Sequence, residues 1–178
     1  MYQASKARLS RSEKIQTKNS ASRGEISAKR TTRQPTAETV SATVVAIAGE
    51  ANKELVRRFY REAINERDAS ACERLLTADF VHNDEARGRI GQVQAVEAFL
   101  TAFPDLRNEI VLILAEDDLV AAHQRWTGTH EGPFLGVEPT GRSVEFTSTA
   151  LLRFRDGLIA VAWDEVDVAG LMAQLGSS

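Results

Sequence analysis

The chain has 178 residues, of which 43% are hydrophobic and 26% are charged. This composition provides apolar material for one ordinary core but too little length for two comfortable domains, so we expect one folded domain. No run approaches the roughly 18 apolar residues of a membrane-spanning helix, which argues against a membrane enzyme. Cys72 is the only cysteine, which excludes an internal disulfide and indicates a packed thiol in a reducing compartment.

The formal net charge of -3 is distributed unevenly along the chain. Residues 1–40 hold nine Lys or Arg against three Glu, a net charge of +6, which leaves -9 for the remainder. Their apolar residues are isolated and show no period, so the segment cannot bury enough surface to offset its ordering entropy. We predict a disordered basic tail over 1–40 and a linker over 41–51. Tyr2 is the only aromatic residue of this tail, so we expect no specific nucleic-acid partner.

Residues 40–48 are similar to the apolar part of an export signal, with Ala46 and Ala48 as small residues before a cleavage site. The stretch is short, is diluted by threonine and follows an overlong tail. We therefore expect a cytoplasmic protein and keep export as the alternative.

A folded domain is predicted over 52–178, and its first part has helical spacing. Apolar residues recur every three or four positions from Leu55 to Ile64, as on the buried face of a helix. Pro104 ends the last helix of this region. A polar, glycine-containing loop is expected over 79–91, beginning with two strand-like residues. The predicted helices cover 52–64, 69–76 and 92–103.

After Pro104 the pattern changes to that of extended strands, separated by turn residues such as Asp156-Gly157 and by a long loop over 131–142. Helices followed by an antiparallel meander favour an α+β fold, with a curved sheet covered by helices on its concave side. No metal-ligand spacing, dinucleotide-binding, phosphate-loop or serine-nucleophile motif is found, so we expect neither a metal nor a cofactor. The predicted strands cover 107–115, 119–130, 144–155 and 158–166.

The last two predicted strands define one face of a pocket. If their hairpin closes with a three-residue loop, Ala150 and Asp164 share a face, together with Ser148, Leu152, Ala160 and Ala162. Small alanines on this face leave space for a ligand, although they suit helix packing equally well. The same register directs Ile159, Val161 and Trp163 to the opposite face, where a dimer partner would cover them.

Three stretches of the sequence resemble one known family. The segment GTHEGPFLGVEPTGR at 128–142 is similar to the GTHxGxFLGxxPTGR signature of SnoaL-like polyketide cyclases, also called ester cyclases. The segment AFPDL at 102–106 and the C-terminal stretch from Trp163 to Gly176 resemble the same family in order and spacing. The resemblance covers residues 52–176.

This resemblance implies a cone-shaped α+β barrel of the kind shared with nuclear transport factor two, with about three N-terminal helices over a mainly antiparallel sheet. It also implies a homodimer through the sheet, and cofactor-free aldol-type cyclisation or isomerisation of a hydrophobic carbonyl compound. Asp164 matches the family's catalytic aspartate. A carboxylate in an apolar pocket has a raised pKa and is a stronger base, which suits carbon-acid chemistry. The alternative role for Asp164 is a bond to water or backbone at a strand end.

The other predicted site residues depart from the family's pattern. His82, predicted as catalytic, and Asn83, predicted as ligand-binding, lie where the family has an Asn-His-Asp or Asp-His-Asp triplet, but here the order differs. A surface loop is the alternative for His82. Ala150 falls where characterised cyclases carry a second acid/base histidine, and alanine transfers no protons. This departure favours a non-catalytic small-molecule-binding or interaction module as the alternative function.

Four further residues complete the predicted ligand site: Trp126, His130, Phe134 and Trp163. The two tryptophans would provide flat walls for an aromatic ligand, with core packing as their alternative role. His130 would bond a ligand oxygen or, alternatively, anchor the long loop. Epoxide hydrolysis would need an Asp/Arg/Asp trio around one water, and the spacing supplies none.

Overall fold

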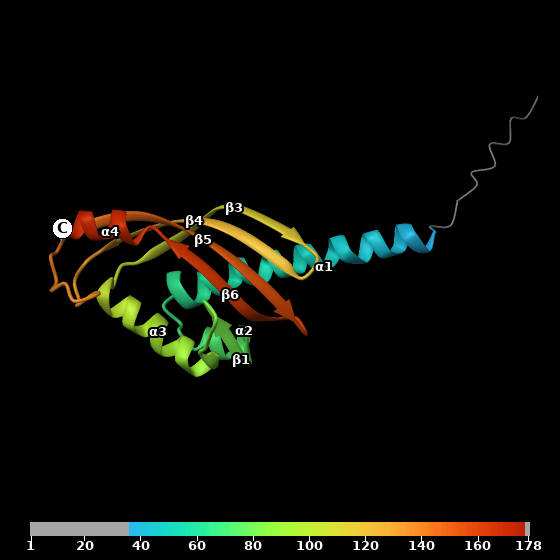
Figure 1. Cartoon of the computed structure of the whole chain (residues 1–178), viewed down its shortest axis with the longest axis horizontal. Coiled ribbons are helices and arrows are strands. Elements are labelled where there is room, and N and C mark those ends of the chain that lie inside the picture. Colours follow the sequence, from blue (N-terminus) through green and yellow to red (C-terminus); the bar gives the residue numbers. More distant parts are fainter. Residues whose placement is uncertain (1–35, 177–178) are drawn as a thin grey trace, which may run out of the picture. The chain divides into compact units, whose positions relative to one another are not determined.

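A computed structural model of the chain describes residues 36–176 (Figure 1). The predicted tail over 1–40 lies almost entirely outside these described residues. In chain order the elements are α1 (Ala37–Phe59), the π-helical turn η1 (Tyr60–Asn65), α2 (Ala71–Leu75), β1 (Leu76–His82), β2 (Glu85–Ala86), α3 (Gly88–Ala102), β3 (Arg107–Glu116), β4 (Leu119–Thr129), β5 (Ser143–Arg155), β6 (Leu158–Val166) and α4 (Val168–Leu175).

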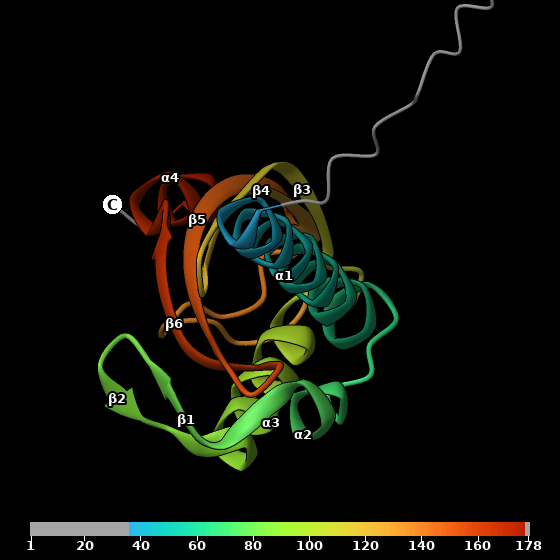
Figure 2. The same ribbon diagram turned by 90° about the vertical axis from the view of Figure 1, so that its right-hand side faces the viewer.

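The strands form one six-stranded sheet in the order β2-β1-β6-β5-β4-β3. β1 and β6 run parallel, and the other neighbouring strands run antiparallel. The sheet curls around the helices (Figure 2) but does not close, because β2 and β3 remain its two edges. The α+β class and the curved, mainly antiparallel sheet with helices on one side are thus confirmed, while the barrel is open.

α1 begins well before the predicted helix. The side chain of Thr36 caps its first turn by accepting a hydrogen bond from the backbone N–H of Thr39 at 3.3 Å. Gly49 is buried against the sheet, and a Cβ placed there would stand 3.4 Å from the Cβ of Ala115. Residues 41–51, predicted as a linker, are therefore helical, because this helix has a cap and a packing partner that its weak period does not indicate.

The segment predicted as a polar loop over 79–91 contains the end of β1, all of β2 and the start of α3. β1 reverses into β2 through Asn83 and Asp84, whose φ angles are 48° and 64°. Asn and Asp tolerate this left-handed conformation better than other non-glycine residues, which is why a two-residue turn forms here. The parallel pairing of β1 with β6 joins residues far apart in sequence and was not predicted.

The helix α4 was also not predicted. Asp167 caps it by accepting a hydrogen bond from the N–H of Gly170 at 2.9 Å, and its apolar residues Leu171 and Leu175 are buried. β6 pairs with β5 only from residue 148 onwards. The side chain of Gln174 bonds both backbone groups of Glu145, so α4 completes the hydrogen bonding of β5 beyond the end of β6.

The β5–β6 hairpin differs in detail from the predicted one. Asp156 and Gly157 form a two-residue turn, and the extra residue is absorbed by a bulge at Ala160. Ala150 still pairs with Asp164, as predicted. Ile159, however, pairs with Phe154 and is buried, so its predicted outward orientation is wrong. A bulge reverses the alternation of a strand on one side of it, which simple period counting does not detect.

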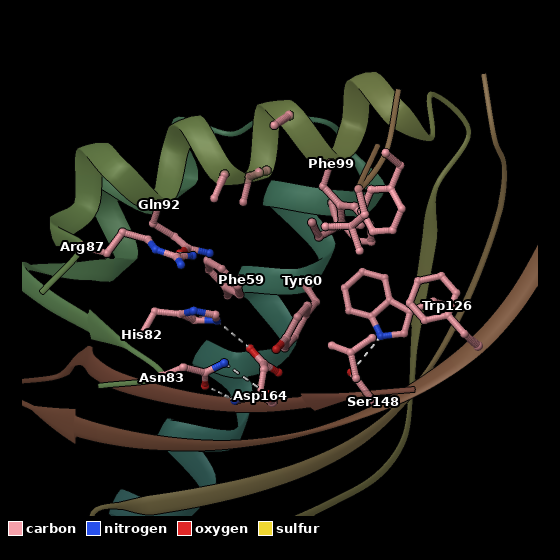
Figure 3. A pocket seen from close by; sticks show the side chains of 18 of the residues that line it. Phe59, Tyr60, His82, Asn83, Arg87, Gln92, Phe99, Trp126, Ser148 and Asp164 are labelled. Atoms are coloured by element: carbon pink, nitrogen blue, oxygen red, sulfur yellow. Dashed lines mark hydrogen bonds and ion pairs between the residues drawn. The ribbon is translucent and has the colours of Figure 1, made fainter. Parts of the chain in front are cut away.

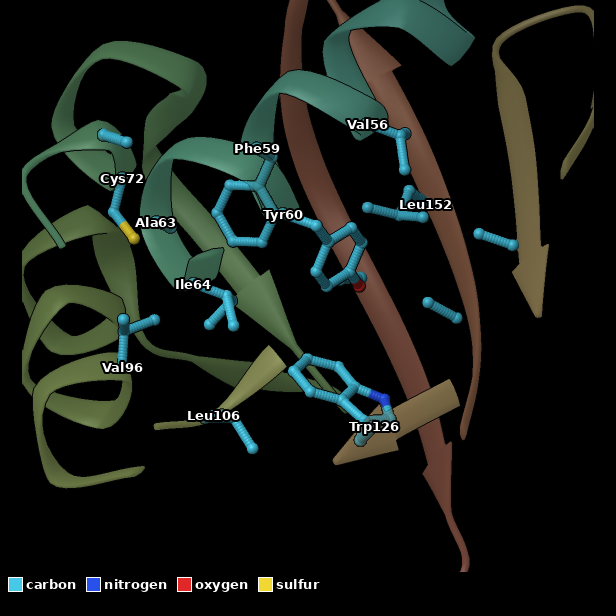
Figure 4. Close-up of a cluster of buried hydrophobic side chains, with 14 of the residues drawn as sticks. Val56, Phe59, Tyr60, Ala63, Ile64, Cys72, Val96, Leu106, Trp126 and Leu152 are labelled. Carbon is cyan, nitrogen blue, oxygen red and sulfur yellow. The ribbon is translucent and has the colours of Figure 1, made fainter. Parts of the chain in front are cut away.

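One hydrophobic core lies between the sheet and the helices α1, α2 and α3 (Figure 4). Val56 of α1, Val96 of α3 and Leu152 of β5 contribute side chains that are almost fully buried. Cys72 of α2 is also buried, and this burial raises the pKa of its thiol to about 11. The predicted packed thiol is thereby confirmed.

Candidate active site

A cavity of about 640 Å³ lies between the helical layer and the concave face of the sheet (Figure 3). This volume falls within the roughly 300–1,000 Å³ typical of small-molecule sites. Its walls come from η1, α3, the end of β1, the strands β4, β5 and β6, and the loop after β4. Aromatic side chains gather at one end and charged and amide groups at the other, so the cavity has an apolar and a polar half.

An aspartate and a histidine meet in the polar half. The parallel pairing of β1 with β6 places His82 beside Ala162, two residues before Asp164. As a result, Nε2 of His82 lies 3.2 Å from Oδ2 of Asp164. The two side chains are only 17% and 22% exposed. A carboxylate and an imidazole are therefore in contact at the cavity wall, largely screened from solvent.

Asn83 holds Asp164 by its backbone. The side-chain Oδ1 of Asn83 accepts a hydrogen bond from the N–H of Asp164 at 2.8 Å, and its Nδ2 donates to the carbonyl oxygen of Asp164 at 3.3 Å. The backbone N–H of Asn83 donates to the carbonyl of Ala162 at 2.9 Å. The side-chain amide of Asn83 thus bonds both backbone groups of residue 164, as the backbone of a neighbouring strand would. These bonds fix the position of residue 164.

Tyr60 brings a buried hydroxyl group to the same place. It is the first residue of η1 and is only 6% exposed, and Figure 3 shows its hydroxyl end directed toward Asp164. Burial and then the negative charge of Asp164 raise the pKa of Tyr60 well above its ordinary value, against a lowering by a hydrogen bond with Gln124. Gln124 is itself fully buried and accepts a hydrogen bond from Asn108 at 2.7 Å. Tyr60 is therefore a protonated hydroxyl at neutral pH.

Arg87 and Gln92 form the other side of the polar half. Nη1 of Arg87 donates to Oε1 of Gln92 at 3.3 Å, and Nη2 lies 3.4 Å from a carboxylate oxygen of Glu85. Figure 3 shows both side chains facing the cavity across from His82. The hairpin that carries His82 and the start of α3 thus deliver three polar side chains to one end of the cavity.

The apolar half is built from aromatic rings. Trp126 and Phe146 stack with an interplanar angle of 1° and centroids 6.0 Å apart. Phe99 packs edge-on against Trp126 at 6.0 Å, and Phe134 lies 5.7 Å from Phe99. The indole N–H of Trp126 donates to Oγ of Ser148 at 2.9 Å, which leaves no buried donor unpaired on this residue. These rings offer flat, apolar walls to a ligand.

The long loop predicted over 131–142 is fastened at its base. Nδ1 of His130 lies 3.1 Å from Oγ1 of Thr140, and the imidazole packs against the ring of Phe103 at 5.4 Å. His130 is fully buried and does not line the cavity. Of its two predicted roles, the structure supports anchoring of the loop, whose tip carries Phe134 into the cavity wall.

A carboxylate fixes the neighbouring AFPDL segment to the end of β4. Asp105 accepts hydrogen bonds from the hydroxyl of Thr129 at 2.7 Å and from its backbone N–H at 2.5 Å. The hydroxyl and then the N–H of Thr129 hold the pKa of Asp105 below its usual value. Asp105 thus ties the segment after α3 to the end of β4.

Two predicted ligand contacts lie outside the cavity. Ala150 faces the core directly opposite Asp164 but is fully buried beneath the cavity wall. Trp163 is on the outer face of the sheet, because successive strand residues alternate and Asp164 faces inward. Its indole N–H donates to Asp84 at 3.0 Å, and the guanidinium of Arg153 lies 5.3 Å from its ring. The predicted residues that do line the cavity are His82, Asn83, Trp126, Phe134 and Asp164.

The family model of SnoaL-like polyketide cyclases matches residues 54–175, which is more than half of the chain. The chain belongs to this family. Its fold is accordingly that of the nuclear transport factor two-like superfamily, and the predicted resemblance is confirmed. No curated protein matched the SnoaL-like chain in the comparison.

Solved structures agree with this membership. AclR of Streptomyces galilaeus, a candidate hydroxylase, is 35% identical, with a TM-score of 0.66 over 73% of this chain and 98% of AclR. IdmH of Streptomyces antibioticus, a candidate polyketide cyclase, is 31% identical, with a TM-score of 0.63 over 70% of this chain and 98% of IdmH. TsrD of Streptomyces laurentii is 29% identical, with a TM-score of 0.68 over 72% of this chain and 97% of TsrD.

Several cavity residues of this SnoaL-like protein were not predicted. Tyr60 and Phe99 lie in helical apolar patterns that indicate only a buried face. Arg87 lies in the stretch predicted as a loop, and Gln92 is the first residue of the predicted helix 92–103. The only feature of the sequence that could have indicated Arg87 is its position directly before Gly88, where α3 begins. Between residues 36 and 176, no three His, Cys, Asp or Glu side chains are grouped to hold a metal ion. In the same residues, no helix is both long and apolar enough to cross a membrane.

Proposed function

We propose that this protein is a cofactor-free acid/base enzyme that cyclises or isomerises a hydrophobic carbonyl compound, with Asp164 as the general base. One observation carries the proposal: Asp164 and His82 are in contact, 3.2 Å apart, at the polar end of an otherwise aromatic cavity. A base near an apolar binding surface can meet a carbon acid that water would otherwise surround.

The chemistry follows from the two groups. The carboxylate of Asp164 removes a proton from a carbon next to a carbonyl, which leaves an enolate. In a cyclisation, the enolate carbon attacks a second carbonyl of the same molecule, and the resulting alkoxide takes up a proton. In an isomerisation, the proton returns to a different carbon. His82, bonded to Asp164, orients the carboxylate and passes the proton back.

His82 is proposed as the proton-transfer partner because this chain has no histidine at the position where characterised cyclases carry their second acid/base residue. Ala150 stands opposite Asp164 on β5 and has no titratable atom. His130 is fully buried on Thr140 and Phe103, and His123 is exposed on the outer face, where it contacts Thr149. His82 reaches the same carboxylate from β1 instead of β5.

The alternative function is a non-catalytic module that binds a small hydrophobic molecule. Ala150 favours it, since this position cannot transfer a proton. A binding module requires no polar groups around one carboxylate, whereas here His82 contacts the carboxylate of Asp164 and Tyr60 lies within the influence of its charge. This grouping supports the enzyme.

The test is turnover of anthraquinone-type ester substrates by wild type and by Asp164→Asn, which keeps size and the backbone contacts to Asn83. Loss of the base is expected to lower kcat by about 10²- to 10⁴-fold. Asp156→Asn, at the exposed β5–β6 turn, is the control and should match wild type. Equal rates for Asp164→Asn and wild type would remove the assigned role. Ligand binding without turnover by any variant would establish the binding module.

A further inference from the structure

Arg87 carries the only permanent positive charge among the described residues that line the cavity. Its side chain is 26% exposed, so most of the guanidinium and its stem are already withdrawn from water. The stem crosses the first turn of α3 at Gly91, where a Cβ would stand 2.8 Å from Cγ of Arg87. Gly91 thus leaves the space that lets Arg87 lie against the helix and face the cavity.

The hydrogen bonds that Arg87 makes within the protein are long. Its hydrogen bond to Gln92 is 3.3 Å long, and its contact with Glu85 is 3.4 Å long. Both distances exceed the 2.7–2.9 Å of a good charge-assisted hydrogen bond. Glu85 is 76% exposed, so its attraction is weakened by solvent. An apolar ligand that filled the cavity would cover this guanidinium and leave its charge only weakly compensated.

We infer that the ligand of this cavity combines a flat apolar body with a carboxylate, and that Arg87 binds the carboxylate. The guanidinium presents forked N–H donors that match the two oxygens of a carboxylate. The amide of Gln92 offers a further donor at the same place. The apolar body then lies over Phe99, Trp126 and Phe134 in the other half of the cavity.

The arrangement also orients such a ligand. Figure 3 shows Arg87 and Gln92 at one end of the cavity, Trp126 and Phe99 toward the other, and Asp164 between them. A ligand anchored at both ends would present its middle to Asp164. This inference rests on the proposed function because it concerns the ligand of the same cavity, but it requires binding and not turnover.

The test measures binding of two probes of equal shape to the full chain by isothermal titration calorimetry. The probes are 2-naphthoate, which is ionised at neutral pH, and the neutral 2-naphthamide. Wild type is expected to bind naphthoate at least about tenfold more tightly, because a bidentate ion pair replaces neutral hydrogen bonds. Arg87→Gln is expected to bind naphthamide as wild type does and to show no preference for naphthoate.

Arg89→Gln is the matched control. Arg89 lies two residues further along the chain, but its Nη1 donates to the carbonyl oxygen of Glu73 at 2.8 Å, outside the cavity wall. This variant should keep the full preference. Retained naphthamide binding by Arg87→Gln also shows that its cavity is intact.

Equal affinity of wild type for the two probes would overturn the inference, even if Arg87→Gln did not fold. A preference that survives in Arg87→Gln would overturn it as well. Asp164→Asn separates the two proposals: it should keep the preference for naphthoate while losing turnover. If Asp164→Asn keeps both the preference and the turnover, Asp164 is not the base, but the carboxylate site at Arg87 stands. If wild type shows no preference and turnover depends on Asp164, the base stands and the carboxylate site is wrong.

Discussion

Tyr60 joins the helical layer to the polar half of the cavity, and its environment gives a pH-dependent prediction. Its pKa in the folded protein is raised, first by burial and then by the charge of Asp164. The unfolded chain ionises this hydroxyl near pH 10, whereas the folded protein does not. Its contribution to stability is therefore complete below about pH 10 and is lost as the pH rises toward the folded value.

Tyr60→Phe should accordingly lower the free energy of unfolding by about 1 kcal/mol at pH 7, because the polar interactions of the buried hydroxyl are lost. The difference between wild type and variant should shrink between about pH 9 and 11, since only wild type releases the proton on unfolding. Urea denaturation across this range measures both effects. A difference in unfolding free energy that stays constant with pH would show that the pKa of Tyr60 is not raised in the folded protein.

At single positions, the sequence indicated some of the site and missed the rest for a clear reason. Asp164, His82 and Asn83 were predicted together, and the structure brings them into contact. Arg87 could not be placed because its role depends on Gly91 leaving room for its stem. Trp163 was predicted to face outward from the strand register and also to form a ligand wall. The structure places it on the outer face, where it does not line the cavity.

The loop over 130–142 shows how one element depends on a close backbone approach. The N–H groups of Glu131 and Gly132 donate to the carbonyl of Ala102 at the end of α3, at 3.0 and 3.1 Å. A Cβ at Gly132 would overlap the carbonyl oxygen of Thr101 and stand 3.0 Å from Cα of Ala102. The absence of a side chain is thus what allows the loop to reach the helix.

Gly132→Ala should therefore destabilise the protein by about 1–3 kcal/mol, because the loop must move away from α3. Since the loop carries Phe134, binding of a naphthalene probe should weaken as well. Thermal unfolding and calorimetric titration measure the two effects. Gly136→Ala is the comparison, because nothing lies within 4 Å of its Cβ position and only its positive φ of 81° is strained. A Gly132 variant as stable as wild type would contradict the description of the contact.

Among the secondary structure elements, the central strands were the most predictable. β5 alternates strictly between exposed and buried residues over 143–155, and this period is visible in the sequence. β1, α4 and the bulge at Ala160 depend on partners distant in the chain: β6 for β1, and the free end of β5 for α4. No local pattern contains that information, so these elements were missed or misplaced.

The outer face of the sheet carries an apolar row across four strands. Leu114, Ala121, Leu151 and Trp163 are consecutive partners in the ladder. Leu114 is 60% exposed and Leu151 39% exposed. Large exposed apolar residues that line up in this way are typical of an interaction surface. We propose that a second copy of the chain covers this row in a homodimer.

Leu151→Lys should then convert the dimer into a monomer, because it places a charge in the middle of the row. Light scattering after size-exclusion chromatography should show a mass near 19.5 kDa for this variant and twice that mass for wild type. Glu138→Lys, in the exposed loop after β4, is the control and should remain dimeric. A wild-type mass of one chain, or an unchanged dimer in Leu151→Lys, would exclude this surface as the interface.

The two hydrogen bonds from the side chain of Asn83 to the backbone of residue 164 have a consequence for how the activity of such a protein can change. Asn83 grips residue 164 only through main-chain groups that every amino acid other than proline possesses. The position of residue 164 at the cavity wall therefore does not depend on the identity of its side chain. A serine, cysteine or histidine substituted there would be delivered to the same spot, so a new reactivity can arise by one replacement without rebuilding the scaffold.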